Sequence, residues 1–79
     1  MSRTAMIFAA LREDMKRYKA QGAQLLLRSR VDADGLHFIA HFTDVGNPKL
    51  RAKIITITDK YCESLVKVRE TKSTMSFMI

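Results

Sequence analysis

The spacing of apolar and polar positions predicts an amphipathic helix at the start of the chain. Within residues 3–21, apolar side chains recur every three or four positions, at Phe8, Leu11, Met15 and Tyr18. This spacing places them on one stripe of a helix. Hydroxyl residues stand where they can cap its first turn, and Gly22 stands where a left-handed residue would end it.

The next two segments alternate with a period of two, as β-strands do. In residues 23–31, Leu25, Leu27 and Val31 share one face, and in residues 36–43 apolar side chains occupy every second position, at Leu36, Phe38, Ala40 and Phe42. Between them, Asp32-Ala33-Asp34-Gly35 is a strong turn signal, because Asp and Gly tolerate tight backbone conformations. We therefore expect an antiparallel hairpin.

The expected register of this hairpin determines which side chains share a face. With the turn at residues 32–35, Arg30 lies opposite His37 and Arg28 lies opposite Ile39. His41 follows on the same face of the second strand. The sequence thus predicts a basic sheet face that points away from the interior.

The second half of the chain has a less regular pattern. Residues 50–58 are rich in Ile and Thr and follow an Asn47-Pro48 pair, which predicts a loop and then a third strand. That strand would carry Arg51 and Lys53 onto the basic face. Residues 59–70 predict a second helix, although the valines of 65–68 also fit a strand.

The last stretch, residues 73–79, alternates again and places three apolar side chains on one side. These are Met75, Phe77 and Ile79. Such a segment can form a fourth strand, plug the core or contact another chain, which would make it an interface tail of a homodimer.

The expected fold is therefore α+β: a helix, an antiparallel sheet of three or four strands and a C-terminal helix, with both helices on one face of the sheet. Residues 1–79 have the length of a single domain. The expected core consists of Phe8, Leu11, Met15, Leu25, Leu27, Phe38, Phe42, Ile54 and Leu65.

Charge and cysteine content narrow the function. Fourteen Lys and Arg against eight Asp and Glu give a net charge of +6, which favours an acidic partner. The single cysteine, Cys62, excludes an intrachain disulfide and suits a reducing, cytoplasmic compartment. The longest apolar run, residues 5–11, is too short to span a membrane.

No combination of residues predicts catalysis or a bound metal. His37 and His41 would lie roughly 13 Å apart along a strand, too far to bind one ion. Cys62 lacks any flanking signature of a nucleophile. We expect a protein that is not an enzyme and has no cofactor.

The basic face is the predicted binding site. Its expected residues are Arg28, Arg30, His37, His41, Arg51 and Lys53, joined from the first helix by Arg12, Lys16, Arg17 and Lys19. Clustered cations bind phosphate backbones, so we expect RNA or DNA as the partner. The alternative is a protein–protein modulator, an adaptor or inhibitor, that docks on an acidic or nucleic-acid-handling protein. The outward Leu26, Ile39 and Ile55 would then form its apolar centre.

The predicted element order is similar to two RNA-binding architectures, the double-stranded-RNA-binding domain and the Alu-domain subunits of the signal recognition particle. The spacing of five features carries the second resemblance: Leu11 to Lys19, Gly22, Leu27 with Asp34-Gly35, Thr43-Asp44, and Ile54 to Thr58. Where the first family begins its helix with Lys-Lys-x-x-Lys, this chain has Asp59-Lys60. Both resemblances imply RNA binding.

Overall fold

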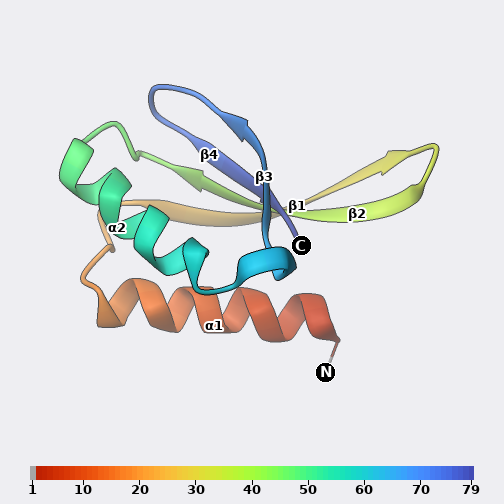
Figure 1. The fold of residues 1–79 in the computed structure, drawn as a ribbon, viewed down its shortest axis with the longest axis horizontal. Helices are drawn as coiled ribbons and strands as arrows, with labels where there is room; N and C mark the ends of the chain where they lie inside the picture. Colours follow the sequence, from red (N-terminus) through yellow and green to blue (C-terminus); the bar gives the residue numbers. More distant parts are fainter. Residues whose placement is uncertain (1) are drawn as a thin grey trace.

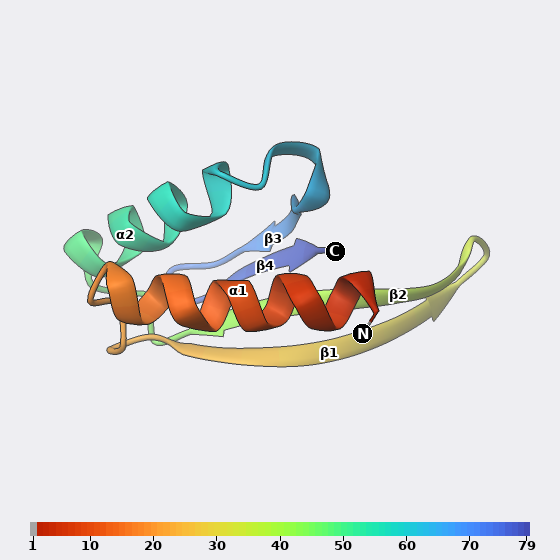
Figure 2. The same ribbon diagram turned by 90° about the horizontal axis from the view of Figure 1, so that it is seen from below.

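The structure is a computed structural model that describes residues 2–79. It is an α+β fold of two α-helices and a four-stranded antiparallel sheet. The elements are α1 (Arg3–Arg17), β1 (Gln24–Asp32), β2 (Gly35–Thr43), α2 (Pro48–Asp59), a 3-10 turn η1 (Cys62–Ser64), β3 (Val66–Glu70) and β4 (Met75–Met78). The sheet order is β1-β2-β4-β3, and both helices cover the same face (Figures 1 and 2). Within residues 2–79, no helix is long and apolar enough to cross a lipid bilayer.

Helix α1 confirms the first prediction but ends earlier than expected. The Ser2 hydroxyl accepts a hydrogen bond of 3.2 Å from the backbone N–H of Ala5, which satisfies one donor of the first turn. The helix buries Leu11 and Met15. Beyond its end, Lys19 has a positive φ of 56°, so this residue, rather than Gly22, takes the left-handed conformation.

The hairpin of β1 and β2 has the predicted register. Arg30 pairs with His37 and Arg28 pairs with Ile39. Gly35 has a φ of 111°, a conformation that glycine adopts without steric cost. The end of the hairpin projects beyond the helices (Figure 1).

The prediction of a third strand at residues 50–58 is wrong, because this segment lies in α2. The Asn47 side chain accepts hydrogen bonds from the backbone N–H groups of Lys49 and Leu50, and Pro48 occupies the first turn. The Asn47-Pro48 pair, from which the sequence analysis predicted a loop, is therefore a helix cap followed by a favourable proline at the first helical position. Ile54, Ile57 and Thr58 form the buried face of this helix.

The predicted C-terminal helix over 59–70 is also wrong. After α2, the chain makes the short turn η1, where Cys62 has a positive φ of 48°. It then enters β3, so the strand alternative for the valine-rich stretch is the correct one. The order is helix, two strands, helix, two strands, and the element order that supported both RNA-binding resemblances is not present.

Strand β4 occupies the middle of the sheet, between β2 and β3. Met75 is 1% exposed and Phe77 is 6% exposed, and Ile79 packs against the core. Of the three roles considered for this segment, the fourth strand is the one that the structure has. The interface tail is contradicted, since Met75 and Phe77 are buried within their own chain.

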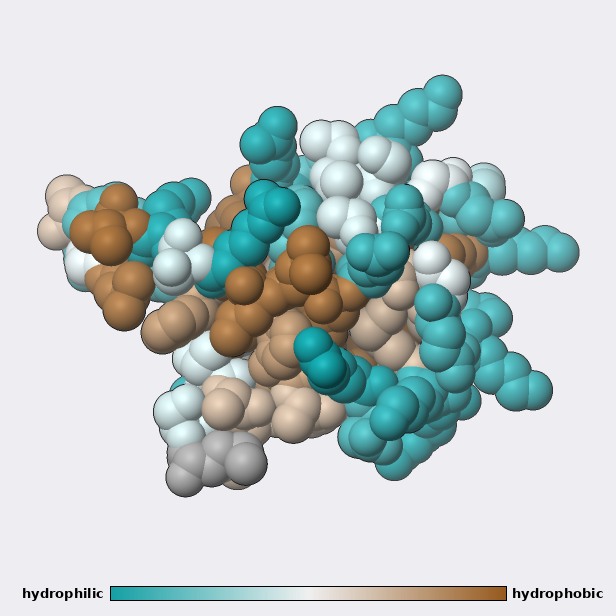
Figure 3. All heavy atoms as spheres, turned by 180° about the vertical axis from the view of Figure 1, so that it is seen from behind, coloured by the Kyte–Doolittle hydropathy of each residue, from teal (hydrophilic) through white to brown (hydrophobic). Residues whose placement is uncertain are grey.

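The core lies between the helices and β2 and β4, and it leaves β1 largely uncovered. Leu11, Met15, Phe42, Ile54 and Leu65 are buried as predicted. Phe8, Leu25 and Phe38 are only half-buried, and Leu27 is 44% exposed. The reason is that β1 runs along the outer edge of the sheet, beyond α1 (Figure 2). Apolar atoms are correspondingly exposed in the middle of the face seen in Figure 3, and again on the projecting end of the hairpin.

Candidate nucleic-acid interface

The face of the sheet opposite the helices carries the four strand residues that the sequence predicted for it. Arg28 and Arg30 alternate along β1, and His37 and His41 alternate along β2. The neighbouring positions Ala40 and Phe42 are fully buried on the helix side. The period-two pleat therefore directs the two arginines and two histidines to the same open face.

Near the turn, the positive charge of this face is partly balanced by Asp32. Its carboxylate lies 3.0 Å from His37 Nε2 and 3.7 Å from Arg30 Nη2. A hydrogen bond from the backbone N–H of Asp34, aided by His37 and Arg30, lowers the pKa of Asp32 despite slight burial. Arg30 and His37 thus form a compact group with their own counter-charge.

Further from the turn, the face has a shallow hollow of about 350 Å³ without an acidic side chain among its lining residues. Each of the four strands contributes a polar side chain to it: Arg28 from β1, His41 from β2, Ser76 from β4 and Arg69 from β3. Within residues 2–79, neither Arg28 nor Arg69 forms an ion pair with an acidic residue. The hollow therefore presents positive charge that the described chain does not neutralise.

The pKa of His41 reflects the electrostatic environment of this hollow. Burial, followed by the positive charges of Arg28 and Arg69, holds the pKa of His41 below its usual 6.5. Its Nδ1 lies 2.6 Å from Ser76 Oγ. When the hydroxyl donates this hydrogen bond, Nε2 carries the ring proton and can itself act as a donor. A negative group placed here would meet the guanidinium groups of Arg28 and Arg69 and a neutral imidazole, together with Arg30, which also lines the hollow and is paired with Asp32.

Arg69 is the site residue that sequence reasoning missed. The register shifts between Lys67 and Arg69, so that Lys67 pairs with Phe77 and Arg69 pairs with Ser76. In a regular strand, residues 67 and 69 would point to the same face. The bulge at this point turns Arg69 to the open face, and the sequence contains no signal for its position.

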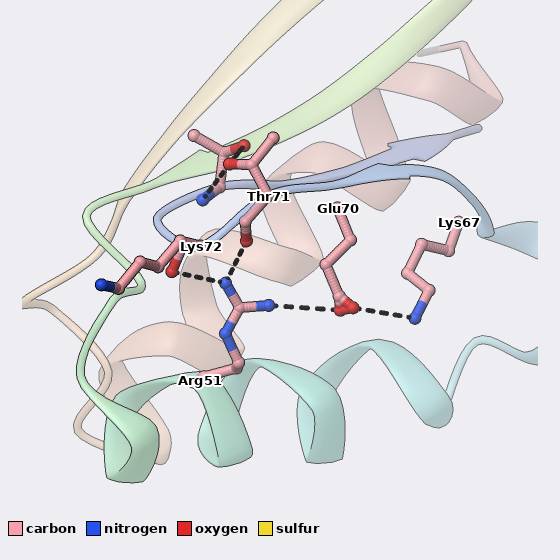
Figure 4. A network of polar contacts seen from close by, with 6 residues as sticks. Arg51, Lys67, Glu70, Thr71 and Lys72 are labelled. Atoms are coloured by element: carbon pink, nitrogen blue, oxygen red, sulfur yellow. Dashed lines mark hydrogen bonds and ion pairs between the residues drawn. The ribbon is translucent and has the colours of Figure 1, made fainter.

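The sequence predicted Arg51 and Lys53 on the basic face. They lie instead on α2, where their side chains donate hydrogen bonds to the backbone of neighbouring loops. The Arg51 guanidinium donates hydrogen bonds of 2.5 and 2.9 Å to the carbonyls of Thr71 and Lys72, and it lies 3.2 Å from Glu70 (Figure 4). Lys53 Nζ donates a hydrogen bond of 3.0 Å to the carbonyl of Lys19. These contacts leave both cations outside the hollow.

The cations of the first helix region do not extend the open face either, because α1 covers the other side of the sheet. Arg12 stacks over the Phe8 ring at 5.0 Å. Lys16 lies 3.3 Å from Glu13, and Arg17 lies 3.9 Å from Asp14. Lys19 lies in the turn after the helix. The structure thus keeps Arg28, Arg30, His37 and His41 of the predicted set together and separates the other six.

Apolar side chains border the hollow, and two of the three expected ones, Leu26 and Ile39, lie on the open face. Ile39 forms its floor and is 8% exposed, while Ile55 belongs to α2. The exposed apolar positions nearby are Leu26, Val66 and Val68. The sheet phenylalanines are on the helix side of the sheet, so the open face offers no benzyl ring for base stacking; they are Phe38, Phe42 and Phe77.

Comparisons with protein-family models, curated proteins and solved structures find no match for this chain. Within residues 2–79, no three His, Cys, Asp or Glu side chains gather where they could hold a metal ion. Cys62 is an exposed thiol in the η1 turn, on the helix side of the sheet and away from the hollow.

Proposed function

We propose that this protein is a non-catalytic nucleic-acid-binding protein whose open sheet face holds the phosphate backbone. The observation that carries the proposal is the convergence of Arg28 and Arg69, from opposite edges of the sheet, on one hollow without an acidic side chain. Two guanidinium groups beside a donor imidazole supply the positive charge and the hydrogen-bond donors that phosphate oxygens require. The exposed Cys62 thiol is consistent with a reducing, cytoplasmic setting.

The same face favours backbone recognition over the reading of bases. Single-stranded nucleic acids are commonly held by aromatic side chains on which bases stack. The sheet phenylalanines, among them Phe42 and Phe77, pack against each other in the core with ring centroids 5.8 Å apart. We therefore expect weak sequence preference and strong dependence of the affinity on salt concentration.

The test is a fluorescence-anisotropy titration of labelled single- and double-stranded RNA and DNA oligonucleotides at a series of salt concentrations. The logarithm of the affinity should fall linearly with the logarithm of the salt concentration. The slope should correspond to two to four neutralised phosphates, that is about −1.8 to −3.6 for a duplex. Absence of binding at low salt, or an affinity that does not depend on salt, would refute the proposal.

A second candidate function is a protein–protein modulator, an adaptor or inhibitor that docks on an acidic protein. The exposed Leu26, Val66 and Val68 support it, because protein interfaces combine apolar contacts with arginine. Polyglutamate serves as the discriminating competitor in the same titration. If it displaces the oligonucleotide at equal or lower charge concentration, the acidic-protein function is favoured; if it does not, the nucleic-acid function is.

A further inference from the structure

We propose that two copies of this chain associate through β1, so that their sheets join edge to edge into one antiparallel sheet of eight strands. The proposal is independent of the hollow on the open face. Strand β1 has nine residues and is exposed along almost its whole length, and among residues 2–79 it pairs only with β2. Its outer side therefore presents unpaired backbone N–H and C=O groups to which another strand can bind.

The two edges of the sheet differ in a way that favours β1 as the interface. Strand β3, at the other edge, has only five residues and is interrupted by the bulge between Lys67 and Arg69. Short length and bulges are the features by which natural sheets block edge pairing. Strand β1 has no proline and pairs with β2 without a break from Gln24 to Asp32.

A second copy also fits the apolar side chains that β1 leaves exposed. At the projecting hairpin end, where Figure 3 shows apolar atoms, Val31 is 77% exposed and Leu36 is 59% exposed. Beside the first half of β1, a hollow of about 550 Å³ separates this strand from α1. Its apolar lining comes from Ala9, Met15, Ala23 and Leu25. In an antiparallel pair of β1 strands, the hairpin end of each copy lies at the hollow of the other.

The charges around these two features are complementary. The hairpin turn carries two acidic residues: Asp32, which is paired with Arg30 and His37, and Asp34, which forms no ion pair within residues 2–79 and gives the turn its negative charge. The hollow is flanked by Arg12 and Lys16, together with Glu13, which lies 3.3 Å from Lys16. An acidic turn from a second copy would meet the two cations and the one carboxylate of the hollow. Because the cations outnumber the carboxylate, the net interaction is attractive. The turn and the hollow occur on every copy, so both contacts form twice about a two-fold axis.

The arginines of β1 restrict the register of this pairing. With the two-fold axis at Leu27, Arg28 lies opposite Leu26 of the second copy and Arg30 lies opposite its Gln24. Moving the axis by one residue to Arg28, or by two to Ser29, would place arginines of the two copies opposite each other, which is unfavourable. The Leu27 register also brings Val31 of the second copy opposite Ala23, at the hollow.

The test measures the mass of the full chain by light scattering on a size-exclusion column, from about 1 µM to about 1 mM, the range in which modest interfaces dissociate. We expect twice the 9.0 kDa chain mass at the upper end. Leu27→Lys should shift the protein to monomer, and Val66→Lys, an equally exposed apolar position at the other edge, should not. A monomer over the whole range, or equal effects of the two variants, would overturn the proposal.

Charge reversal tests the electrostatic complementarity of the turn and the hollow without a substitution in β1. Asp34→Lys alone and Lys16→Glu alone should each raise the dissociation constant about tenfold, and the double variant should restore association. Circular dichroism on each variant verifies that the monomer is folded. Failure of the double variant to recover the dimer while both singles remain folded would refute the proposed pairing of turn and hollow.

Discussion

Arg69 lies opposite Ser76 across the β3–β4 ladder because one extra residue, Val68, interrupts the alternation of β3. This single irregularity moves a guanidinium group from the helix side to the open face. It brings Arg69 to the hollow that Arg28 enters from the other edge of the sheet. The charge of the candidate site therefore depends on a backbone feature as well as on the number of basic residues.

We predict that Arg28 and Arg69 contribute equally to the binding of nucleic acid. Arg28→Gln and Arg69→Gln should each weaken binding and reduce the magnitude of the salt slope by about 1, since each removes one phosphate contact. Lys49→Gln, an exposed cation at the start of α2, should leave the slope unchanged. Anisotropy titrations at several salt concentrations measure all three. Equal losses for Lys49→Gln would show that only net charge matters.

We predict that binding strengthens as the pH falls from about 7.5 to 5.5. Burial and the charges of Arg28 and Arg69 keep the pKa of His41 low in the unbound protein, so His41 is neutral at pH 7. A phosphate in the hollow would raise that pKa, and binding would then take up a proton. One proton gives at most a tenfold gain per pH unit, about 1.4 kcal/mol.

The matched variants for this pH dependence are His41→Gln and His37→Gln. The first should abolish the gain at low pH, because no titrating group of the hollow remains. The second should preserve it, since His37 interacts with Asp32 outside the hollow. A pH dependence that survives in His41→Gln would assign the effect to another group and contradict the prediction.

Removal of residues 75–79 should abolish the native fold rather than a contact with another chain. Strand β4 pairs with both β2 and β3, and Met75 and Phe77 are buried. Loss of one large core side chain costs about 3–5 kcal/mol, a large part of the stability of a small domain. Thermal unfolding followed by circular dichroism should show no cooperative transition. A truncated chain that still unfolds cooperatively would contradict this prediction.

The first half of the fold was predictable because its signals are local. The spacing of Leu11 and Met15 marks a helix face, and the Asp-Gly turn determines the register that sets Arg30 opposite His37. These features depend on residues within a few positions of each other. The face shared by Arg28, Arg30, His37 and His41 follows from that register alone.

Helix α2 was not predictable because its residue types favour a strand while its environment favours a helix. Isoleucines and threonines favour strands, yet α2 forms because Ile54 and Ile57 fill the core and Asn47 caps the helix. Packing between distant segments outweighs intrinsic preference here. The same applies to Arg69, because the bulge that reorients it appears only when β3 pairs with β4.

Away from the site, a partly buried polar cluster joins α1 to the end of α2. The Asp14 carboxylate, whose side chain is 7% exposed, accepts hydrogen bonds of 2.7 Å from Tyr61 Oη and 3.0 Å from Lys60 Nζ. Burial raises the pKa of Asp14, but these two hydrogen bonds and the charges of Lys60 and Arg17 outweigh it, so the pKa lies below its ordinary value of 3.8. Burial and the contact with Asp14 raise the pKa of Tyr61.

We predict that Tyr61→Phe lowers the free energy of unfolding at pH 7 by about 1.5–3 kcal/mol, the usual contribution of a hydrogen bond to a charged group. Because the pKa of Asp14 is depressed by folding, its stabilisation is complete above the unfolded value of 3.8 and is lost as the pH falls through the lower folded value. The difference between wild type and Tyr61→Phe should therefore shrink below about pH 4 in urea titrations.

The control for this prediction is Tyr18→Phe, at an exposed ring. It should change the free energy of unfolding by less than about 0.5 kcal/mol at either pH. A loss in Tyr61→Phe that is equal at pH 7 and pH 3 would show that packing, rather than the bond to the carboxylate, is what the tyrosine contributes.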